Sequence, residues 1–248
     1  MKDGDMNKDS IALAYCDNGM VDGKFMQGVA DVMLKSGVKF DTTLRSGGNQ
    51  IARQRQSLTE YWYDKTDYEW LLWVDSDVVI SPEKFKLLWD NRDAVERPLI
   101  SGVYFTTDNP EEPLMVPMPT VFSFTNKGDG SFGLSRIHPL PKNELIKVDA
   151  AGFGFLLMHR SVVEKVRAVS PEGQMFMEMG RGTKFIGEDI FFFALCDTAE
   201  VPLYCHTGAT APHMKRFSFD EHYYNAFFGA ADNKKESNLI LPKHHRKK

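Results

Sequence analysis

The chain has 248 residues, of which 42% are hydrophobic and 26% charged, and its formal net charge is −4. These values are typical of a globular protein with a substantial core, and the negative balance argues against a general nucleic-acid coat protein. No apolar run approaches the length of a membrane span, and the first residues include no apolar signal segment, so we expect a cytoplasmic protein. Cys16, Cys196 and Cys205 form no paired motif and lie in or beside apolar runs, which predicts buried free thiols in a reducing compartment.

Up to about residue 105 the sequence alternates between strand and helix patterns. Apolar runs bounded by turn residues predict strands, and apolar residues spaced three and four apart predict helices. We expect strands at 11–16, 38–43, 70–74 and 99–105, separated by helices at 23–34, at about 50–63 and from 82 onward. This order predicts an α/β fold of Rossmann type, in which helices flank both faces of a mostly parallel mixed sheet.

After residue 105 the pattern becomes mixed. We expect strands at 115–124, 145–148, 153–159 and 202–205, and helices at 161–169 and 188–196. Residues 170–183 are rich in Met, Gly and Pro and are predicted to form a mobile loop. Its part from Gly173 to Gly182 is expected to close over a bound ligand and exclude water.

The sequence contains no repeat and no clear linker, so a single domain is predicted. It would span residues 10–215, with 10–105 as a nucleotide-binding half and 106–215 as an acceptor half. Residues 1–9 are expected to be disordered. Residues 216–248 are expected to form a tail that is first aromatic and then basic.

Two carboxylates follow a strand that we expect to be buried. The apolar run at 70–74 leads directly into Asp75 and Asp77, and Ser81, Pro82 and Glu83 then start a well-capped helix. Ligands bind at the carboxyl ends of the strands in such sheets. Two acids this close repel each other without a cation, and hard divalent cations prefer oxygen ligands. The pair therefore indicates a metal-bound phosphate, although Asp and Ser are also common in structural turns.

A second acidic pair opens a predicted helix. Glu188 and Asp189 follow Gly187 and precede the phenylalanines at 191–193. Acids at this end of a helix can be structural caps, because the helix dipole favours negative charge there. A carboxylate held beside a hydrophobic cluster also has its charged form disfavoured, which moves its pKa towards neutrality. That is a property of a general base, and Asp189 is the candidate.

Histidines and arginines complete the set of candidates. His206 and His213 bracket a short segment near the last expected strand, and either is a candidate ligand or an ordinary structural histidine. A histidine beside carboxylates would shift metal preference from Mg²⁺ towards Mn²⁺. Arg53 and Arg55 lie two residues apart on the second helix and so do not share a face. Either one reaches a phosphate while the other is solvated, or both are ordinary surface arginines.

In this order the motifs resemble those of the GT-A glycosyltransferases, which use nucleotide-sugar donors. The matching segments are Asp17, IARQ at 51–54, LLWVDSD at 71–77, VDAAGFGFLLMHR at 148–160, GEDIFF at 187–192 and HTGATAPHMKR at 206–216. They correspond to the DxD and xED motifs of inverting members and their surroundings, and cover about residues 10–215. The family often has Asn where this chain has Gln54, which is a departure from the pattern.

The resemblance implies roles for the acids and for one histidine. Asp77 and His213 would bind Mn²⁺ or Mg²⁺, with Asp75 assisting or touching the ribose. Asp189 would deprotonate the acceptor hydroxyl, and Glu188 would orient the acceptor. His213 is chosen because related sequences place a histidine a few residues beyond the last strand.

The resemblance also implies where the donor binds. Tyr15, Asp17 and Arg53 would hold the nucleotide, and Ala151 and Gly152 would pass close to the donor sugar. The expected reaction is transfer of a sugar from a nucleotide-sugar, with a UDP-sugar favoured, to an acceptor hydroxyl with inversion. The acceptor is expected to be a glycan or another hydroxyl compound. Because residues 243–248 are basic, hydroxymethylated DNA is a minority alternative.

Two rival functions are weaker. A nucleotidyltransferase should carry a basic, Gly-rich loop after the first strand, whereas residues 16–20 read Cys-Asp-Asn-Gly-Met. A non-catalytic nucleotide- or carbohydrate-binding protein would not need both acidic motifs.

Overall fold

The computed structural model describes residues 9–107, 116–126, 132–181, 184–215 and 221. One compact unit, Met1–Thr106 with Pro117–Met214, contains the central sheet and the helices that flank it. A second unit, Thr107–Val116 with Lys215–Lys248, lies almost entirely outside the described residues. The segments predicted to be a disordered N-terminus and a C-terminal tail also lie almost wholly outside them.

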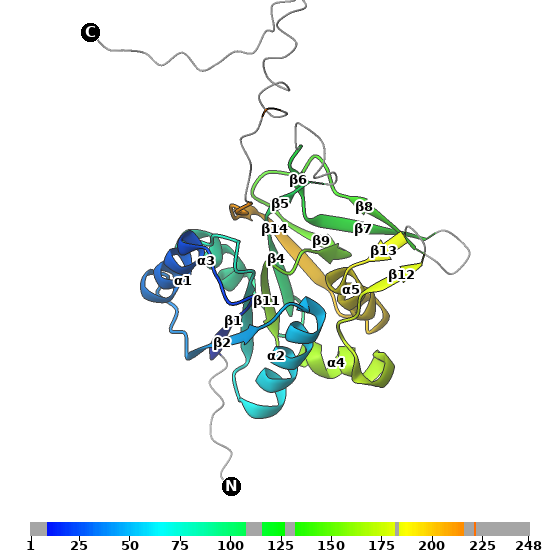
Figure 1. Cartoon of the computed structure of the whole chain (residues 1–248), viewed down its shortest axis with the longest axis horizontal. Helices are drawn as coiled ribbons and strands as arrows, with labels where there is room; N and C mark the ends of the chain where they lie inside the picture. Colours follow the sequence, from blue (N-terminus) through cyan, green and yellow to red (C-terminus); the bar gives the residue numbers. More distant parts are fainter. Residues whose placement is uncertain (1–8, 108–115, 127–131, 182–183, 216–220, 222–248) are drawn as a thin grey trace, which may run out of the picture. The chain divides into compact units, whose positions relative to one another are not determined.

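A seven-stranded sheet forms the centre of the first unit (Figure 1). Its strands are β1 (Ile11–Asp17), β2 (Thr42–Gly47), β3 (Trp70–Val74), β4 (Leu99–Val103), β9 (Leu145–Val148), β11 (Phe155–His159) and β14 (Leu203–Thr210). They lie in the order β2-β1-β3-β11-β4-β14-β9, and only β9 and β11 run against the others. The predicted α/β fold with a mostly parallel mixed sheet is confirmed.

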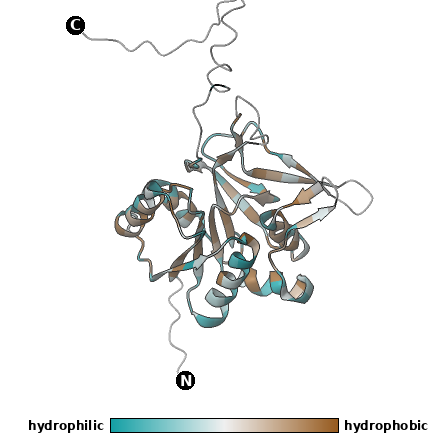
Figure 2. Ribbon diagram, viewed as in Figure 1, coloured by the Kyte–Doolittle hydropathy of each residue, from teal (hydrophilic) through white to brown (hydrophobic). Residues whose placement is uncertain are grey.

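Helices cover both faces of the sheet, as predicted (Figure 1). They are α1 (Gly23–Lys35), α2 (Ile51–Lys65), α3 (Pro82–Asn91), α4 (Ser161–Val169) and α5 (Glu188–Thr198). Trp70, Leu72 and Val74 of β3 pack with residues of α1 and α3, whereas Leu71 and Trp73 pack with residues of α2, α4 and α5. Side chains of a strand alternate between faces, so a strand covered on both sides must be apolar throughout. The central strands are accordingly coloured as hydrophobic in Figure 2.

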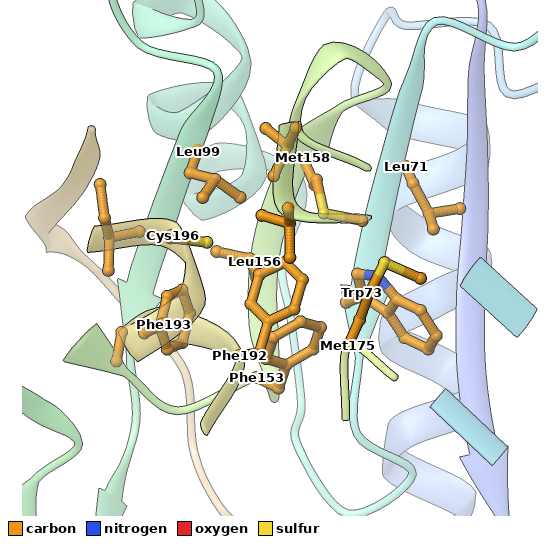
Figure 3. Packing of buried hydrophobic residues seen from close by; sticks show 14 of the residues in the cluster. Leu71, Trp73, Leu99, Phe153, Leu156, Met158, Met175, Phe192, Phe193 and Cys196 are labelled. Carbon is orange, nitrogen blue, oxygen red and sulfur yellow. The ribbon is translucent and has the colours of Figure 1, made fainter. Parts of the chain in front are cut away.

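A cluster of aromatic rings fills the core beneath α5. Phe153 lies at its centre, with its ring centroid 5.1 Å from that of Phe192 and 5.7 Å from that of Trp73 (Figure 3). Phe176 stacks on Phe192 at 4.9 Å. Edge-to-face and stacked pairs of this kind stabilise a core beyond the area that they bury. The cluster also supplies an apolar support for the start of α5.

Smaller sheets extend the second half of the chain. β7 (Val121–Asn126) pairs with β8 (Phe132–Arg136) and β10 (Ala150–Ala151), β5 (Phe105–Thr106) pairs with β6 (Met118–Pro119), and β12 (Met179–Arg181) pairs with β13 (Lys184–Ile186). A 3₁₀ turn, η1 (Pro171–Gly173), follows α4. The predicted strand at 115–124 is therefore divided at its prolines into two short strands, which fits the inability of proline to donate to a ladder.

Two strands of the central sheet, β2 and β14, differ most from their predicted positions. The second strand was expected at 38–43, but β2 covers Thr42–Gly47. Phe40 instead packs its ring 5.3 Å from that of Phe85, and β2 is an edge strand whose residues alternate between half-buried and exposed. An edge strand needs little apolar character, so its polar sequence was missed. The last strand was expected at 202–205 and continues to Thr210 in β14.

The prediction of a mobile loop over 170–183 is wrong for its central part. Met175 and Phe176 are buried in the core. Their N–H groups donate to Gln56 Oε1 at 2.9 and 3.3 Å, and Gln56 Nε2 donates to the Gly173 carbonyl at 3.0 Å. A buried glutamine of α2 thus satisfies backbone groups that would otherwise be unpaired. Part of the remainder forms the β12–β13 pair.

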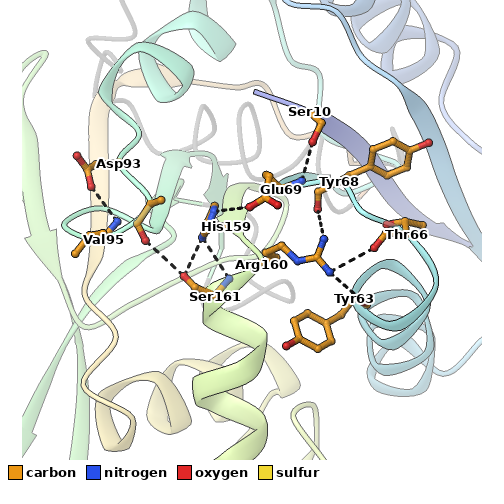
Figure 4. A network of polar contacts seen from close by, with 11 residues as sticks. Ser10, Tyr63, Thr66, Tyr68, Glu69, Asp93, Val95, His159, Arg160 and Ser161 are labelled. Atoms are coloured by element: carbon orange, nitrogen blue, oxygen red, sulfur yellow. Dashed lines mark hydrogen bonds and ion pairs between the residues drawn. The ribbon is translucent and has the colours of Figure 1, made fainter. Parts of the chain in front are cut away.

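A polar network lies at the edge of the sheet where β3 begins and β11 ends (Figure 4). His159 Nε2 lies 3.1 Å from Glu69 Oε2, and its Nδ1 lies 2.8 Å from Ser161 Oγ. Arg160 donates to the carbonyls of Tyr63 and Thr66 at 3.1 and 3.4 Å. These carbonyls belong to the end of α2, where the helix itself provides no partner. The network therefore has a structural role.

The three cysteines, Cys16, Cys196 and Cys205, are buried and free, as predicted. Burial raises the pKa of the Cys16 thiol to about 12, so this residue is not a thiolate nucleophile. Within the described residues, no helix combines the length and the apolar character that a membrane span requires.

Candidate active site

The carboxyl ends of the parallel strands bring the acidic motifs to one edge of the sheet. β1 ends at Asp17, β3 leads into Asp75, and β4 leads into Tyr104. β11 runs in the opposite direction, so the segment that precedes it reaches the same edge. The Asp75 N–H donates to the Gly154 carbonyl there at 3.1 Å. Ligands bind at this edge in open α/β sheets.

The segment that follows β14 is fixed to the segment that follows β3. The Val79 N–H donates to the Pro212 carbonyl at 2.9 Å, and the Met214 N–H donates to the Asp77 carbonyl at 2.7 Å. These two backbone bonds flank His213 and set its Nε2 3.1 Å from Asp77 Oδ2. The structure thus brings together two of the residues that were expected to bind a cation.

His213 presents a lone pair to Asp77. Its Nδ1 lies 2.8 Å from the carbonyl oxygen of Phe105, which can only accept a hydrogen bond, so Nδ1 carries the proton. In the neutral ring, Nε2 is then an acceptor that faces a carboxylate, and a proton or a metal ion is needed between them. Metal-binding histidines commonly have their other N–H held in this way. The other candidate, His206, is buried in β14, where its Nδ1 accepts from the Gly208 N–H at 3.2 Å.

The donor set fits a cation that arrives with a phosphate. Among the residues that the structure describes, no group of three or more His, Cys, Asp or Glu side chains could hold a metal ion. Asp77 and His213 would supply two ligands to such a cation, and the Asp77 side chain is 39% exposed, which leaves room for others. Mg²⁺ in phosphate sites is usually bound through one or two carboxylates, with waters and phosphate oxygens as the remaining ligands.

Arg55 joins the two acidic motifs. Its Nη2 donates to Asp75 Oδ1 at 2.8 Å, and its Nη1 donates to Glu188 Oε1 at 2.6 Å. Its side chain is only 5% exposed, and its guanidinium carbon lies 4.7 Å above the ring of Phe153. Burial opposes the charge, but the carboxylates of Asp75, Glu188 and Asp189 outweigh it and raise the pKa of Arg55 above its ordinary value. One buried cation therefore lies between acids 113 residues apart in the chain.

Arg53, the arginine that was expected to hold the nucleotide, is exposed, whereas Arg55 is buried. The signal for Arg55 was present in the sequence. Arg55, Leu58 and Trp62 are spaced three and four apart and share the buried face of α2. A charged residue on such a face needs a partner, and Arg55 has two.

The acids at the start of α5 are partly withdrawn from water. Burial raises the pKa of Asp189, and the nearby Arg55 opposes this effect. Burial raises the pKa of Glu188 for the same reason, again opposed by Arg55. Asp189 Oδ1 accepts from the Ile190 N–H at 2.7 Å. Both acids thus have the perturbation expected of a carboxylate beside the phenylalanine cluster.

Tyr104 was not anticipated from the sequence, although it directly follows the buried strand β4. Its ring contacts that of His213 at 5.0 Å, and its hydroxyl accepts from the Gly154 N–H at 3.4 Å. A Cβ on Gly152 would lie 2.1 Å from this hydroxyl. Gly152 is therefore required by Tyr104, and Ala151, its neighbour, is fully buried in β10. Burial raises the pKa of Tyr104 well above its ordinary value, so the hydroxyl stays protonated.

The end of β1 is held by a dense set of hydrogen bonds. Asp17 accepts from Arg45 through both oxygens, at 2.5 and 2.8 Å, and its Oδ1 also accepts from the Gly19 N–H at 2.7 Å. The bond from Arg45 lowers the pKa of Asp17. Gln54 Nε2 donates to the carbonyls of Asp17 and Ser46, at 3.0 and 2.6 Å. Gln54 thus ties β1 to β2.

Tyr15, the last member of the predicted nucleotide site, is half-buried on the face of β1 that packs against α1, where its ring lies 5.2 Å from that of Phe25. The predicted metal, acid and donor residues thus gather at or near one edge of the sheet, with the exposed Arg53 on the first turn of α2.

Comparisons with known proteins identify the fold alone. No model of a protein family matches the sequence, and no curated protein matches it. Among solved structures, "A197 from STIV" is 19% identical, with a TM-score of 0.50 over 84% of this chain and 86% of that one. GalNAc-T7 with UDP, GalNAc and Mn²⁺ is 9% identical, with a TM-score of 0.55 over 91% of this chain.

The match covers 51% of the GalNAc-T7 chain, so this protein spans about half of that length. The CMP:2-keto-3-deoxy-manno-octonic acid synthetase complexed with CTP is 8% identical, with a TM-score of 0.43 over 91% of this chain and 100% of that one, which is too weak to weigh. The sheet and the first two likenesses support the predicted GT-A-type α/β fold.

Proposed function

We propose that the protein is a metal-dependent glycosyltransferase that moves a sugar from a nucleotide-sugar, with a UDP-sugar favoured, to an acceptor hydroxyl. The single observation that carries the proposal is the meeting of both acidic motifs on one buried cation, Arg55, which contacts Asp75 and Glu188. A shared fold would not require this contact. GalNAc-T7, whose fold is similar, binds UDP, GalNAc and Mn²⁺, which supports the same class of ligand here.

In this proposal Asp77 and His213 hold Mn²⁺ or Mg²⁺, and Asp75 assists with its second oxygen or contacts the ribose. When bound, the cation neutralises the negative charge that develops on the leaving nucleoside diphosphate. A mixed oxygen and nitrogen ligand pair suits Mn²⁺ better than Mg²⁺.

The donor is expected to lie along the edge of the sheet. Tyr15, Asp17 and Arg53 are proposed to hold the nucleotide. Ala151 and Gly152 are proposed to lie near the donor sugar, where Gly152 cannot be enlarged because of Tyr104.

Asp189 is proposed to act as the general base, and Glu188 to orient the acceptor. Asp189 takes the proton of the acceptor hydroxyl, the hydroxyl oxygen bonds to the anomeric carbon, and the bond to the diphosphate oxygen breaks with its electron pair. Attack from the side opposite the leaving group inverts the anomeric centre. A carboxylate whose pKa is raised by burial is a better base at neutral pH than an ordinary aspartate.

A screen of nucleotide-sugars with Mn²⁺ tests the proposal without an acceptor. Slow hydrolysis of one donor, together with a thermal shift caused by its nucleoside diphosphate only when Mn²⁺ is present, is expected. A free nucleoside diphosphate concentration of about 100 times Kd would raise the free energy of unfolding by about 2.7 kcal/mol. Metal-dependent binding without hydrolysis or transfer would instead favour a non-catalytic binding protein. Release of diphosphate from a nucleoside triphosphate would favour a nucleotidyltransferase.

A further inference from the structure

We propose that Arg55 is a positioning residue that fixes the first acid of each motif, so that the second acid of each is placed for chemistry. The inference rests on the proposed function, because it takes from there the roles of Asp77 and Asp189. It adds a residue to the machinery that neither acidic motif contains.

The contacts of Arg55 follow a regular pattern. Its two terminal nitrogens donate to Asp75 and Glu188, which are the first acids of the pairs Asp75/Asp77 and Glu188/Asp189. Neither second acid accepts a hydrogen bond from Arg55: Asp77 Oδ2 faces His213, and Asp189 Oδ1 accepts from the Ile190 N–H. One guanidinium therefore sets the relative position of two chain segments that supply different functions.

The cost of burying Arg55 argues for a role beyond stability. Its side chain is nearly inaccessible, and its Nε is buried with no hydrogen-bond partner among the described residues. An unsatisfied buried donor destabilises a fold, and a buried ion network is often less stable than apolar residues of the same shape. An apolar side chain would also pack at this position, because Arg55 lies against Phe153 on the face of α2 that carries Leu58 and Trp62. The charge at this position is explained by the two carboxylates that it holds, those of Asp75 and Glu188.

Only an arginine suits this place. A planar guanidinium presents two donors in fixed directions, so it can hold two carboxylates at a fixed angle. An ammonium is a point charge on a flexible stem and cannot impose that geometry. Arg55→Lys therefore keeps the charge and removes the positioning.

The test compares Arg55→Lys and Arg55→Met with Arg160→Lys. Arg160 is a matched control, because its guanidinium also donates several hydrogen bonds, to the carbonyls of Tyr63, Thr66 and Tyr68, but it lies at the opposite edge of the sheet (Figure 4). Each protein is assayed for hydrolysis of the donor identified in the screen, for UDP binding with Mn²⁺ by calorimetry, for melting temperature, and for the pH dependence of kcat. Glu188→Gln is measured alone and combined with Arg55→Lys.

We expect Arg55→Lys to lower kcat about 10- to 100-fold, as loss of a supporting contact does at other sites, with a smaller effect on KM. The double variant should lose little more than Arg55→Lys alone, because Arg55→Lys already removes the contact with Glu188. Arg55→Met should move the acid limb of the pH profile upward, because Arg55 holds down the pKa values of Glu188 and Asp189. Arg160→Lys should lower the melting temperature and leave the kcat and the acid limb unchanged.

The outcomes separate this inference from the proposed function. The positioning role alone is overturned if the wild-type protein is active and the Arg55→Lys variant has the same kcat. It is also overturned if Arg55→Lys, like Arg160→Lys, changes only the melting temperature and leaves the acid limb of kcat in place. A wild-type protein that neither binds UDP with Mn²⁺ nor hydrolyses any donor overturns the proposed function. If Arg55→Met fails to fold, Arg55→Lys still decides the question.

Discussion

His213 and Asp77 face each other with Nε2 3.1 Å from Oδ2, although 136 residues separate them in the chain. The Nδ1–H of His213 is already given to the carbonyl of Phe105, so a lone pair is what the neutral ring offers to the carboxylate. Two acceptors at this distance repel each other, and backbone hydrogen bonds on both sides of His213 hold them there. A proton or a metal ion shared by the pair removes that repulsion.

Asp77→Asn is expected to weaken Mn²⁺-dependent binding of UDP and to lower donor hydrolysis about 100-fold or more, because the charge that holds the cation is lost. The half-exposed side chain makes few demands on the fold, so the melting temperature should stay within a few degrees. Calorimetry with and without Mn²⁺ measures the binding. Asp67→Asn, at an exposed position before β3, is the matched control. If UDP binding by Asp77→Asn depends on Mn²⁺ as strongly as in the wild-type protein, Asp77 is not a metal ligand.

Much of the fold was predictable because its signals are local. β3 and α4 begin and end where the sequence placed them, since an uninterrupted apolar run and a helical spacing are properties of the segment itself. β2 was misplaced because an edge strand lacks such a run. Met175 and Phe176 were assigned to a loop because nothing near them in the sequence reveals that Gln56 receives their backbone N–H groups. That contact exists only in three dimensions.

The site likewise contains residues that local sequence signals reveal and residues that only the three-dimensional structure reveals. The acids of both motifs were found from their positions after a strand and before a helix. To predict which of Arg53 and Arg55 is buried, one must know which face of α2 packs on the core. The spacing of Arg55 to Leu58 and Trp62 carries that information, and the motif does not. Tyr104 carried no motif at all. Its place in the site is seen from Gly152, where the Tyr104 hydroxyl leaves no room for a side chain.

Asp189→Asn is expected to lower the kcat of transfer about 10²- to 10⁴-fold, because an amide cannot accept the proton of the acceptor. Burial raises the pKa of Asp189, so the folded protein holds this proton to a higher pH than the unfolded chain does. Stability then falls as pH rises through the window between the two pKa values, and at neutral pH the ionised group is a burden on the fold. The amide keeps an oxygen for the Ile190 N–H and removes that burden, so the melting temperature should stay equal or rise.

Parallel measurements of UDP binding and melting temperature decide the role of Asp189. Loss of nucleotide binding in Asp189→Asn would make it a donor-site residue rather than the base. In the wild-type protein, the acid limb of kcat should lie above the ordinary range of an aspartate, because activity needs the ionised form.

Gly152→Ala is expected to destabilise the fold by about 1–3 kcal/mol, a typical effect of overpacking. The new Cβ would lie 2.1 Å from the Tyr104 hydroxyl, and the ring would have to move away from its contact with His213. Activity should therefore fall together with stability. Urea unfolding measures the change, with Gly23→Ala as the control, since a Cβ there meets nothing within 4 Å. In a Tyr104→Ala background the penalty of Gly152→Ala should disappear, and a penalty that persists would locate the conflict elsewhere.

The stability of the protein is expected to decrease as pH falls below about 6.5, because of the network at the opposite edge of the sheet. Burial lowers the pKa of His159 from its ordinary value of 6.5, although Glu69 opposes this effect. The unfolded chain therefore binds a proton at a pH where the folded protein does not, so the free energy of unfolding decreases through the window between the two values. His159→Gln removes this term and should flatten the dependence between pH 7.5 and 5 in urea unfolding. The slope should be reduced and not abolished, because burial also lowers the pKa of His206. A slope that is unchanged in His159→Gln would mean that Glu69 offsets burial and that the pKa of His159 is the same in the folded and unfolded protein, and a steeper slope would mean that Glu69 outweighs burial.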